Sequence, residues 1–179
     1  MKAEKSENIK NGIEELTYAQ DNISIETVVS EMLIEKNLTI STAESCTGGL
    51  VSATLINYPG ISSVFIEGCV TYSNESKINR LGVNPHTLEV HGAVSEETAR
   101  EMAEGIAKNF NTNVAISTTG IAGPGGGTSD KPVGLVYIGI YVNGKTTVSK
   151  YILPGNREEI RLRATKYAIN DLRLRLLEL

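Results

Sequence analysis

The order of its helical and β-type patterns is the feature that most restricts how this chain can fold. Short β-rich runs occur at 38–42, 64–72 and 114–118. Between and around them, apolar residues recur at the spacing of amphipathic helices, over 25–33, 50–55, 74–81 and 95–109. Strands separated by helical crossovers pair in parallel, so these runs predict parallel strands in one sheet.

A hairpin signal follows the alternating region. Two β-type runs, 134–141 and 145–153, flank Asn143-Gly144, and Asn-Gly between β-branched runs is the strongest short hairpin signal. From Asn156 onward, apolar residues at helical spacing predict a long closing helix. The pattern as a whole predicts an α/β fold with three α/β/α layers and a mixed, mostly parallel sheet that carries an antiparallel hairpin.

The sequence divides into a short leader and one domain. Residues 1–23 are rich in Lys, Glu, Asn and Ser, and we expect a tail or frayed helix there. Residues 24–179 are expected to form a single domain, because no internal repeat or second composition block is found in the sequence.

Composition excludes several classes of protein. Hydrophobic residues make up 40% and charged residues 21%, which is typical of globular proteins. The formal net charge of −4 argues against a nucleic-acid partner. No apolar run approaches the ~18 residues that span a bilayer, and the leader lacks the apolar core of a secretory signal. Two cysteines form no disulfide framework. We therefore expect a cytoplasmic protein with no membrane or nucleic-acid partner.

Familiar catalytic motifs are missing from the sequence. It contains no Gly-x-Ser-x-Gly, Ser-x-x-Lys, His-Glu-x-x-His or Cys-x-x-Cys, so we expect no metal. The only histidines are His86 and His91, and His91 beside Gly92 is better interpreted as a turn or cap residue. A serine or cysteine nucleophile with a base other than histidine remains, as does the absence of catalysis.

Ser45 and Lys77 are the candidates for such a pair. Ser45 lies in a tight polar turn, 43–49, between a predicted strand and a helix, where serine most often serves as an N-cap. A lysine with its ordinary pKa of about 10.4 is protonated at pH 7, so a catalytic lysine must be desolvated until its pKa reaches roughly 7–8. The alternative for Lys77 is a solvated side chain paired with Glu75. The residues alone leave both alternatives open.

A glycine-rich segment over 117–128 follows the third predicted strand. Its backbone could hold a phosphate or an oxyanion, or it could be a flexible surface loop. It matches neither the P-loop nor the dinucleotide-binding pattern, so no nucleotide class follows from it.

Taken together, four segments resemble the C-terminal domain of competence-damage-inducible protein A, a family that includes stand-alone nicotinamide mononucleotide deamidases. They occur in the family's order, and the resemblance covers about residues 24–177. The segments are TAESCTGGLVSATL (42–55), VTYSNESKINRLGV (70–83), HGAVSEETAREMAEG (91–105) and STTGIAGPGGGTSDKPVGLVYIGI (117–140).

The resemblance implies an activity. Family members hydrolyse the carboxamide of nicotinamide mononucleotide to nicotinate mononucleotide and ammonia, without a cofactor, on a three-layer α/β/α fold. The family serine matches Ser45 as nucleophile, and the family tyrosine and lysine match Tyr72 and Lys77, which complete the proton transfer. The threonine expected near the substrate matches Thr119.

These matches lead to an expected mechanism. A neutral Lys77 takes the proton of Ser45, Tyr72 relays it or holds the lysine, and amides at the helix start stabilise the oxyanion. The ribose phosphate would be bound by the glycine-rich loop and Lys131, with Arg157 as a further candidate. Substrate contacts are expected from the same matching segments, at Cys46, Thr47, Gly48, Asn74, Thr119, Gly120 and Gly123.

Two other hypotheses remain open at this point. Cys46 could be the nucleophile, because a thiol at a helix N-terminus has a lowered pKa. The chain could also be a non-catalytic module that binds a nucleotide or a partner. Family analogy favours a homo-oligomer. Longer members carry an extra N-terminal domain that resembles molybdopterin-binding proteins and is associated with pyrophosphatase activity. With about 23 residues before the match, we expect that activity to be absent.

Overall fold

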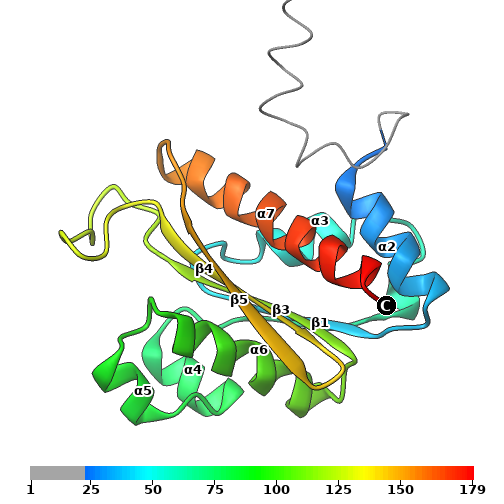
Figure 1. Cartoon of the computed structure of the whole chain (residues 1–179), viewed down its shortest axis with the longest axis horizontal. Coiled ribbons are helices and arrows are strands. Elements are labelled where there is room, and N and C mark those ends of the chain that lie inside the picture. Colours follow the sequence, from blue (N-terminus) through cyan, green and yellow to red (C-terminus); the bar gives the residue numbers. More distant parts are fainter. Residues whose placement is uncertain (1–22) are drawn as a thin grey trace, which may run out of the picture.

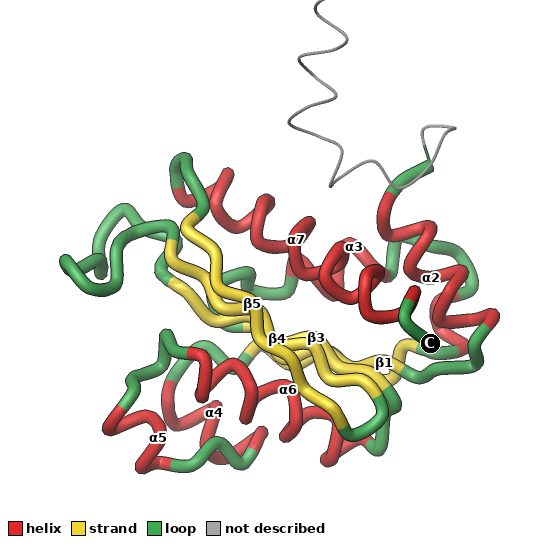
Figure 2. The backbone as a smooth tube through the Cα atoms, viewed as in Figure 1, coloured by secondary structure: helices red, strands yellow, loops and turns green. Residues whose placement is uncertain are grey.

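The computed structural model describes residues 23–179, so all of the predicted leader except Ile23 lies outside the described residues. Eleven helices and strands of at least five residues follow one another in these residues (Figures 1 and 2). The strands are β1 (Ile40–Glu44), β2 (Phe65–Val70), β3 (Val114–Gly120), β4 (Leu135–Val142) and β5 (Lys145–Ile152). The helices are α2 (Ile25–Glu35), α3 (Leu50–Leu55), α4 (Asn74–Leu81), α5 (Pro85–Val90), α6 (Glu96–Phe110) and α7 (Arg157–Leu177).

The five strands form one mixed sheet in the order β2-β1-β3-β4-β5, which confirms the predicted fold class. β1 pairs in parallel with both β2 and β3, whereas β3–β4 and β4–β5 are antiparallel. β5 therefore runs in the same direction as the first three strands, and only β4 is reversed. The antiparallel pairing extends beyond the predicted hairpin, because β4 also pairs with β3 along its whole length, from Val114↔Val142 to Gly120↔Val136.

Helices cover both faces of this sheet. In Figure 1, α2, α3 and α7 lie on one face, and α4, α5 and α6 lie on the other. The cause is the chain path: α3 leads from β1 to β2, and α4–α6 lead back past β1 to β3. Because parallel crossovers are right-handed, connections that run in opposite directions along the sheet fall on opposite faces. The strand order thus reverses at β1, and ligands of open α/β sheets bind at such a reversal, beyond the carboxyl ends of the strands.

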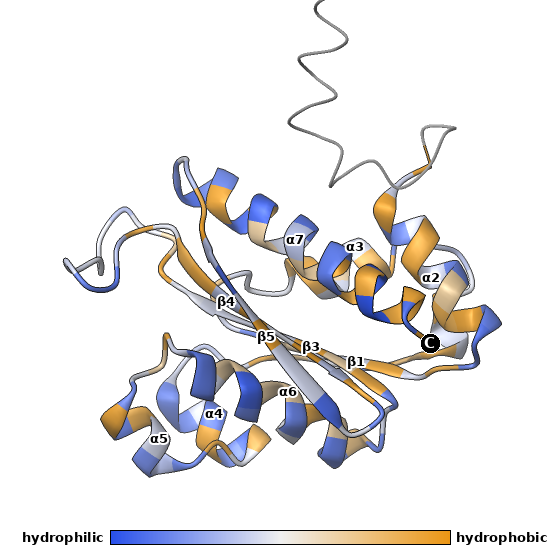
Figure 3. Ribbon diagram, in the orientation of Figure 1, coloured by the Kyte–Doolittle hydropathy of each residue, from blue (hydrophilic) through white to orange (hydrophobic). Residues whose placement is uncertain are grey.

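Each face of the sheet has its own apolar core. On one side, buried residues of α2 and α7, such as Val29 and Leu172, pack on Ile40 and Ile116. On the other, Met102 and Ile106 of α6 belong to a cluster with Ala43, Cys69 and Leu81. Figure 3 shows apolar colour concentrated along the central strands and hydrophilic colour over much of α6. Because both sides are covered, β1 is buried along its whole length.

The structure differs from the predicted elements in two places. β1 spans residues 40–44 rather than 38–42, which places Glu44 inside the sheet. The helix α5 was not predicted; it begins after Asn84, whose side chain accepts a hydrogen bond from the His86 amide. His91 is the C-cap of this helix, which confirms the expectation of a cap role.

Within residues 23–179, no helix combines the length and the apolar content that crossing a bilayer requires.

Candidate functional site

The candidate residues gather at the carboxyl ends of β1, β2 and β3. Ser45 follows β1 directly, Tyr72 lies two residues after β2, and Thr119 is the residue before the last one of β3. The amide of Ser45 donates to the Thr118 carbonyl at 2.9 Å, which continues the β1–β3 pairing by one residue. Because these three strands are parallel, their carboxyl ends meet at the same edge of the sheet. The sheet therefore fixes the backbone of Ser45 directly.

Lys77 reaches this edge from α4. Its Nζ lies 3.1 Å from Ser45 Oγ, 2.8 Å from the Thr71 carbonyl and 3.3 Å from the Tyr72 carbonyl. The side chain is only 1% exposed, and it forms no ion pair with any residue of 23–179. Burial lowers the pKa of Lys77 below its ordinary value, and the opposing effect of Cys46 is smaller. A solvated lysine paired with Glu75, the alternative from the sequence, is therefore ruled out.

The three neighbours of Lys77 match the hydrogen-bonding capacity of a neutral amine. Such an amine has two N–H donors and one lone pair. The two carbonyls accept the two N–H groups, and the lone pair then faces the hydroxyl of Ser45. A protonated lysine would donate to all three oxygens instead. The same arrangement of atoms is therefore compatible with Lys77 before it takes the proton of Ser45 and after it has taken it.

Glu44 organises the turn that follows Ser45. Its fully buried carboxylate accepts hydrogen bonds from three amides at the start of α3, those of Gly49, Val51 and Ser52, at 2.8–3.0 Å. It also accepts the hydroxyls of Thr47 and Ser52, both at 2.7 Å. Glu44 was not among the residues expected at the site; its only signal in the sequence was an acidic residue at the end of a β-type run.

This arrangement excludes one alternative and corrects one expectation from the sequence. The N-cap of α3 is Gly49 and not Ser45, so Ser45 does not have the common capping role. The helix-start amides that were expected to hold an oxyanion are already bonded to Glu44. Earlier in the turn, the amides of Cys46 and Thr47 have no acceptor among residues 23–179.

The thiol of Cys46 is a poor nucleophile in this setting. It is 7% exposed and belongs to the apolar cluster beneath α2 and α7. Burial raises the pKa of Cys46 to about 12, and this outweighs the lowering effects of hydrogen bonds and Lys77. The thiol is therefore protonated at neutral pH, contrary to the lowered pKa that the alternative mechanism requires.

Ser45 opens into a small pocket of about 210 Å³, which we call the Ser45 pocket. Neither His86 nor His91 lines it. Six of the expected site residues besides Ser45 line it, and the segment before α6 adds a further wall. The lining residues are Ser45, Cys46, Tyr72, Lys77, Ala93, Val94, Thr119, Gly120, Ala122 and Arg157.

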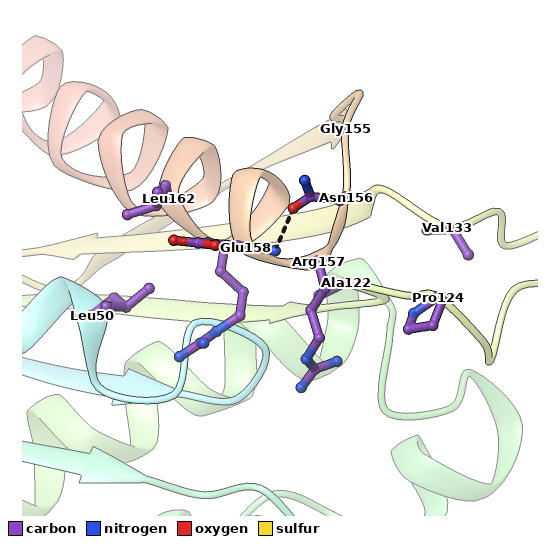
Figure 4. Close-up of a pocket in the computed structure, with 10 residues that line it drawn as sticks. Leu50, Ala122, Pro124, Val133, Gly155, Asn156, Arg157, Glu158 and Leu162 are labelled. Atoms are coloured by element: carbon purple, nitrogen blue, oxygen red, sulfur yellow. Dashed lines mark hydrogen bonds between the residues drawn. The ribbon is translucent and has the colours of Figure 1, made fainter.

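A larger pocket of about 760 Å³ adjoins it along the start of α7 (Figure 4), and we call it the α7 pocket. Ala122 and Arg157 line both pockets, so the two are adjacent. In Figure 4, Arg157 extends from the first turn of α7, beside the hydrogen bond from the Glu158 amide to Asn156. Leu50 and Leu162 give this pocket an apolar side.

Two arginines of α7 connect this pocket to the loops around it. Arg157 donates to the Gly123 carbonyl at 2.9 Å and to the Tyr72 hydroxyl at 3.3 Å. Arg161 donates to the carbonyl of Thr47, in the turn after Ser45, at 2.8 Å. Arg161 was not predicted; its position four residues after Arg157, on the same helix face, was the available signal.

Several expected residues have roles that differ from the expected ones. Tyr72 is 62% exposed and its hydroxyl accepts a hydrogen bond from Arg157, so it is the Tyr72 carbonyl that holds Lys77. The ammonium of Lys131 donates to the carbonyls of His91 and Val94, at 2.6 and 2.7 Å, and lines neither pocket. Lys131 therefore supports the pocket wall. Thr47, Gly48, Asn74 and Gly123 also lie outside both linings.

Thr119 has a similar supporting contact, because its hydroxyl donates to the Ala93 carbonyl at 2.6 Å. No group of three or more His, Cys, Asp or Glu in the described part of the chain is arranged to hold a metal ion.

Known proteins are similar to this chain in sequence and in fold. Residues 22–176 match the family model described as CinA C-terminal domain. Two relatives named competence-damage inducible protein are from Clostridioides difficile (strain 630), 62% identical over 95% of this chain, and Clostridium beijerinckii, 63% identical over 93%. The chain spans about two fifths of the length of these curated relatives, 42% and 41%.

Solved structures agree with the sequence matches. A CinA superfamily protein from Klebsiella pneumoniae 700603 is 34% identical, with a TM-score of 0.84 over 87% of this chain and 97% of that chain. A CinA superfamily protein from Escherichia coli is 31% identical, with a TM-score of 0.81 over 92% and 98%. This chain therefore belongs to the CinA C-terminal domain family.

Proposed function

We propose that the chain is an amidohydrolase that converts nicotinamide mononucleotide to nicotinate mononucleotide and ammonia. The observation that carries the proposal is the 3.1 Å separation between Ser45 Oγ and the Nζ of a buried lysine whose pKa is lowered. Desolvation without an acidic partner favours the neutral form of an amine, and a neutral amine can take the proton of a hydroxyl beside it and so activate it as a nucleophile.

The proposed reaction has two halves. Lys77 takes the hydroxyl proton while Ser45 Oγ attacks the carboxamide carbon, and the carbonyl oxygen becomes an oxyanion. Lys77 then returns the proton to the amide nitrogen, the C–N bond breaks, and ammonia leaves an ester on Ser45. In the second half, Lys77 deprotonates a water that attacks the ester. The proton goes back to Ser45 Oγ, and nicotinate mononucleotide is released.

The oxyanion needs hydrogen-bond donors close to Ser45. The amides of Cys46 and Thr47 follow the nucleophile in the chain and have no acceptor among residues 23–179, so we assign them this role. The helix-start amides cannot share it, because Glu44 already accepts from them.

We assign the two parts of the substrate to the two pockets. The pyridine ring with its carboxamide would occupy the Ser45 pocket, and the ribose phosphate the α7 pocket, where Arg157 and Arg161 supply cationic donors. Each of these arginines donates one or two bonds within the protein, so other N–H groups remain for a phosphate. This assignment replaces Lys131 as the phosphate ligand, because its ammonium is bonded to two carbonyls.

Ammonium release tests the proposal directly. The chain is incubated with nicotinamide mononucleotide, nicotinamide riboside and nicotinamide, and products are separated by chromatography. We expect turnover of the mononucleotide, loss of turnover in Ser45→Ala and retention in Cys46→Ala. Loss of turnover in Cys46→Ala alone would make the thiol the nucleophile. Binding of the mononucleotide by calorimetry without any product would instead identify a non-catalytic binding module.

A further inference from the structure

The carboxylate of Glu44 is a buried acceptor for which the proposed reaction has no direct use. It is fully buried, and no lysine, arginine or histidine of residues 23–179 pairs with it. A buried carboxylate is costly unless hydrogen bonds replace its water, and Glu44 accepts five of them. All five donors come from the eight residues that follow it in the chain, in the turn after Ser45 and in α3.

The hydroxyls around Glu44 have a defined direction. A carboxylate only accepts, so the hydroxyls of Thr47 and Ser52 donate to it. Thr118 must then donate to Thr47, at 2.7 Å, and Thr42 to Ser52, also at 2.7 Å. The network therefore joins β1, β3, the turn and α3 into one hydrogen-bonded unit, and such fully satisfied networks are rigid.

The side chains of Glu44 and Ser45 point to opposite faces of the sheet. Successive side chains of a strand point to opposite faces, and the Ser45 amide still follows the strand pairing. Glu44 thus faces α3, while Ser45 faces Lys77 of α4. By holding the amides of Gly49 and Val51, Glu44 folds the chain back sharply after Ser45. The amides of Cys46 and Thr47 lie within that fold.

We propose that Glu44 is a positioning residue that sets the geometry of the Ser45 turn for acyl transfer. It touches no reacting atom and acts through the turn that presents Ser45 and the two amides after it. The inference rests on the proposed function for the kind of reaction, but the positioning of an activated serine can be measured without the natural substrate.

Glu44→Gln is the main variant. Glutamine keeps the size of the side chain but replaces one acceptor oxygen with an NH₂ donor, which opposes two or three of the five donors. A loss of geometry of this kind costs roughly 100-fold in rate. We expect kcat for the mononucleotide to fall by about that factor, with KM changed less than about threefold. Phosphonylation of Ser45 by a fluorophosphonate probe, read by mass spectrometry, should slow in parallel.

Two graded variants keep the test valid if Glu44→Gln does not fold. Glu44→Asp retains the carboxylate but withdraws it by one methylene, and Ser52→Ala removes a single hydroxyl donor. Both should label more slowly than wild type and faster than Glu44→Gln. Leu176→Ala is the matched stability control, because this buried residue near the far end of α7 lines neither site pocket. It should lower the Tm while phosphonylation stays at the wild-type rate.

The outcomes separate the inference from the proposed function. Wild-type rates of labelling and turnover in Glu44→Gln, Glu44→Asp and Ser52→Ala, with only a lower Tm, would reduce Glu44 to a stabilising residue and overturn the inference. A wild-type chain that does not label at Ser45 would overturn it as well. Fast labelling in wild type and slow labelling in Glu44→Gln, without product from the mononucleotide, would support the inference and refute the proposed substrate.

Discussion

Lys77→Met replaces the proposed base with an apolar side chain of similar length. The change removes the only group within hydrogen-bond distance of Ser45 Oγ that can accept its proton among residues 23–179. General-base catalysis is worth about 10²–10⁴ in rate, so kcat for the mononucleotide should fall by at least about 100-fold. Wild-type kcat/KM should rise with pH and level off below the ordinary lysine pKa of 10.5, because burial lowers the pKa of Lys77.

The same substitution predicts a pH-dependent change in stability. Methionine leaves the carbonyls of Thr71 and Tyr72 without their donor, and a lost hydrogen bond costs about 1 kcal/mol each. Above about pH 10.5, where the amine is neutral in the folded and the unfolded state, the variant should therefore be about 2 kcal/mol less stable than wild type. The difference in stability between the two proteins should become smaller at lower pH. The unfolded wild-type chain then gains a proton on Lys77, whereas the folded chain must either keep the amine neutral or bury a charge.

The sign follows from proton binding. A lysine with a lowered pKa in the folded state binds fewer protons there than in the unfolded state, so folding stability rises with pH. The contribution of neutral Lys77 to folding stability is fully present above about pH 10.5 and is lost as the pH falls toward its lowered pKa. The slope is at most about 1.4 kcal/mol per pH unit, so the stability difference between variant and wild type can change by up to about 2.7 kcal/mol between pH 9.5 and 7.5, which is enough to reverse its sign.

Urea unfolding of both proteins at pH 7.5, 8.5 and 9.5 measures this difference, and the other titrating groups cancel in the comparison. An exposed or permanently charged lysine would give the same difference at every pH. Such a constant gap, or a Lys77→Met variant with kcat within tenfold of wild type, would refute the assignment of Lys77 as the base.

Three further predictions test the pockets and the packing that supports them. Arg161→Gln should raise KM for the mononucleotide by about 10–100-fold, since a hydrogen bond to a charged group contributes about 1.5–3 kcal/mol. KM for the riboside, which has no phosphate, should stay unchanged, and equal effects on both substrates would exclude a phosphate contact. Cys46 should resist iodoacetamide in the folded protein at pH 7.5, because burial raises its pKa to about 12, and rapid alkylation would contradict this. Gly105→Ala should destabilise the protein by about 1–3 kcal/mol in urea unfolding, because the added Cβ would collide with the Leu81 carbonyl at the end of α4. Alanine normally stabilises helices, so a stabilised variant would show that this contact can relax.

Much of the fold could be predicted because its signals are local. Helical and strand periods, the Asn143-Gly144 turn and the order of elements determine a mixed sheet with helices on both faces. The helix α5 was missed because it is only six residues long, and its signals are the cap Asn84 and Pro85 rather than an apolar stripe. The expected cytoplasmic location and homo-oligomeric state stay predictions.

The site was less accessible from the sequence. Composition and spacing could not distinguish Ser45 from an ordinary cap, or Lys77 from an ordinary surface lysine, because serine often caps helices and lysine is rarely buried. The burial of Lys77 depends on contacts between α4 and the ends of β1 and β2, which no local pattern encodes. For the same reason, the roles of Glu44 and Arg161 became apparent only when the turn after Ser45 was placed against α3 and α7.

The central claim is that an ester forms on Ser45 during turnover. Rapid acid quenching of the Cys46→Ala variant with nicotinamide mononucleotide, followed by peptide mass spectrometry, measures it most directly. The peptide that contains Ser45 should gain the mass of the nicotinate mononucleotide acyl group, and the adduct should disappear in Ser45→Ala. Steady product formation by Cys46→Ala without any adduct, or an adduct found only on Cys46 in the wild-type chain, would contradict the account.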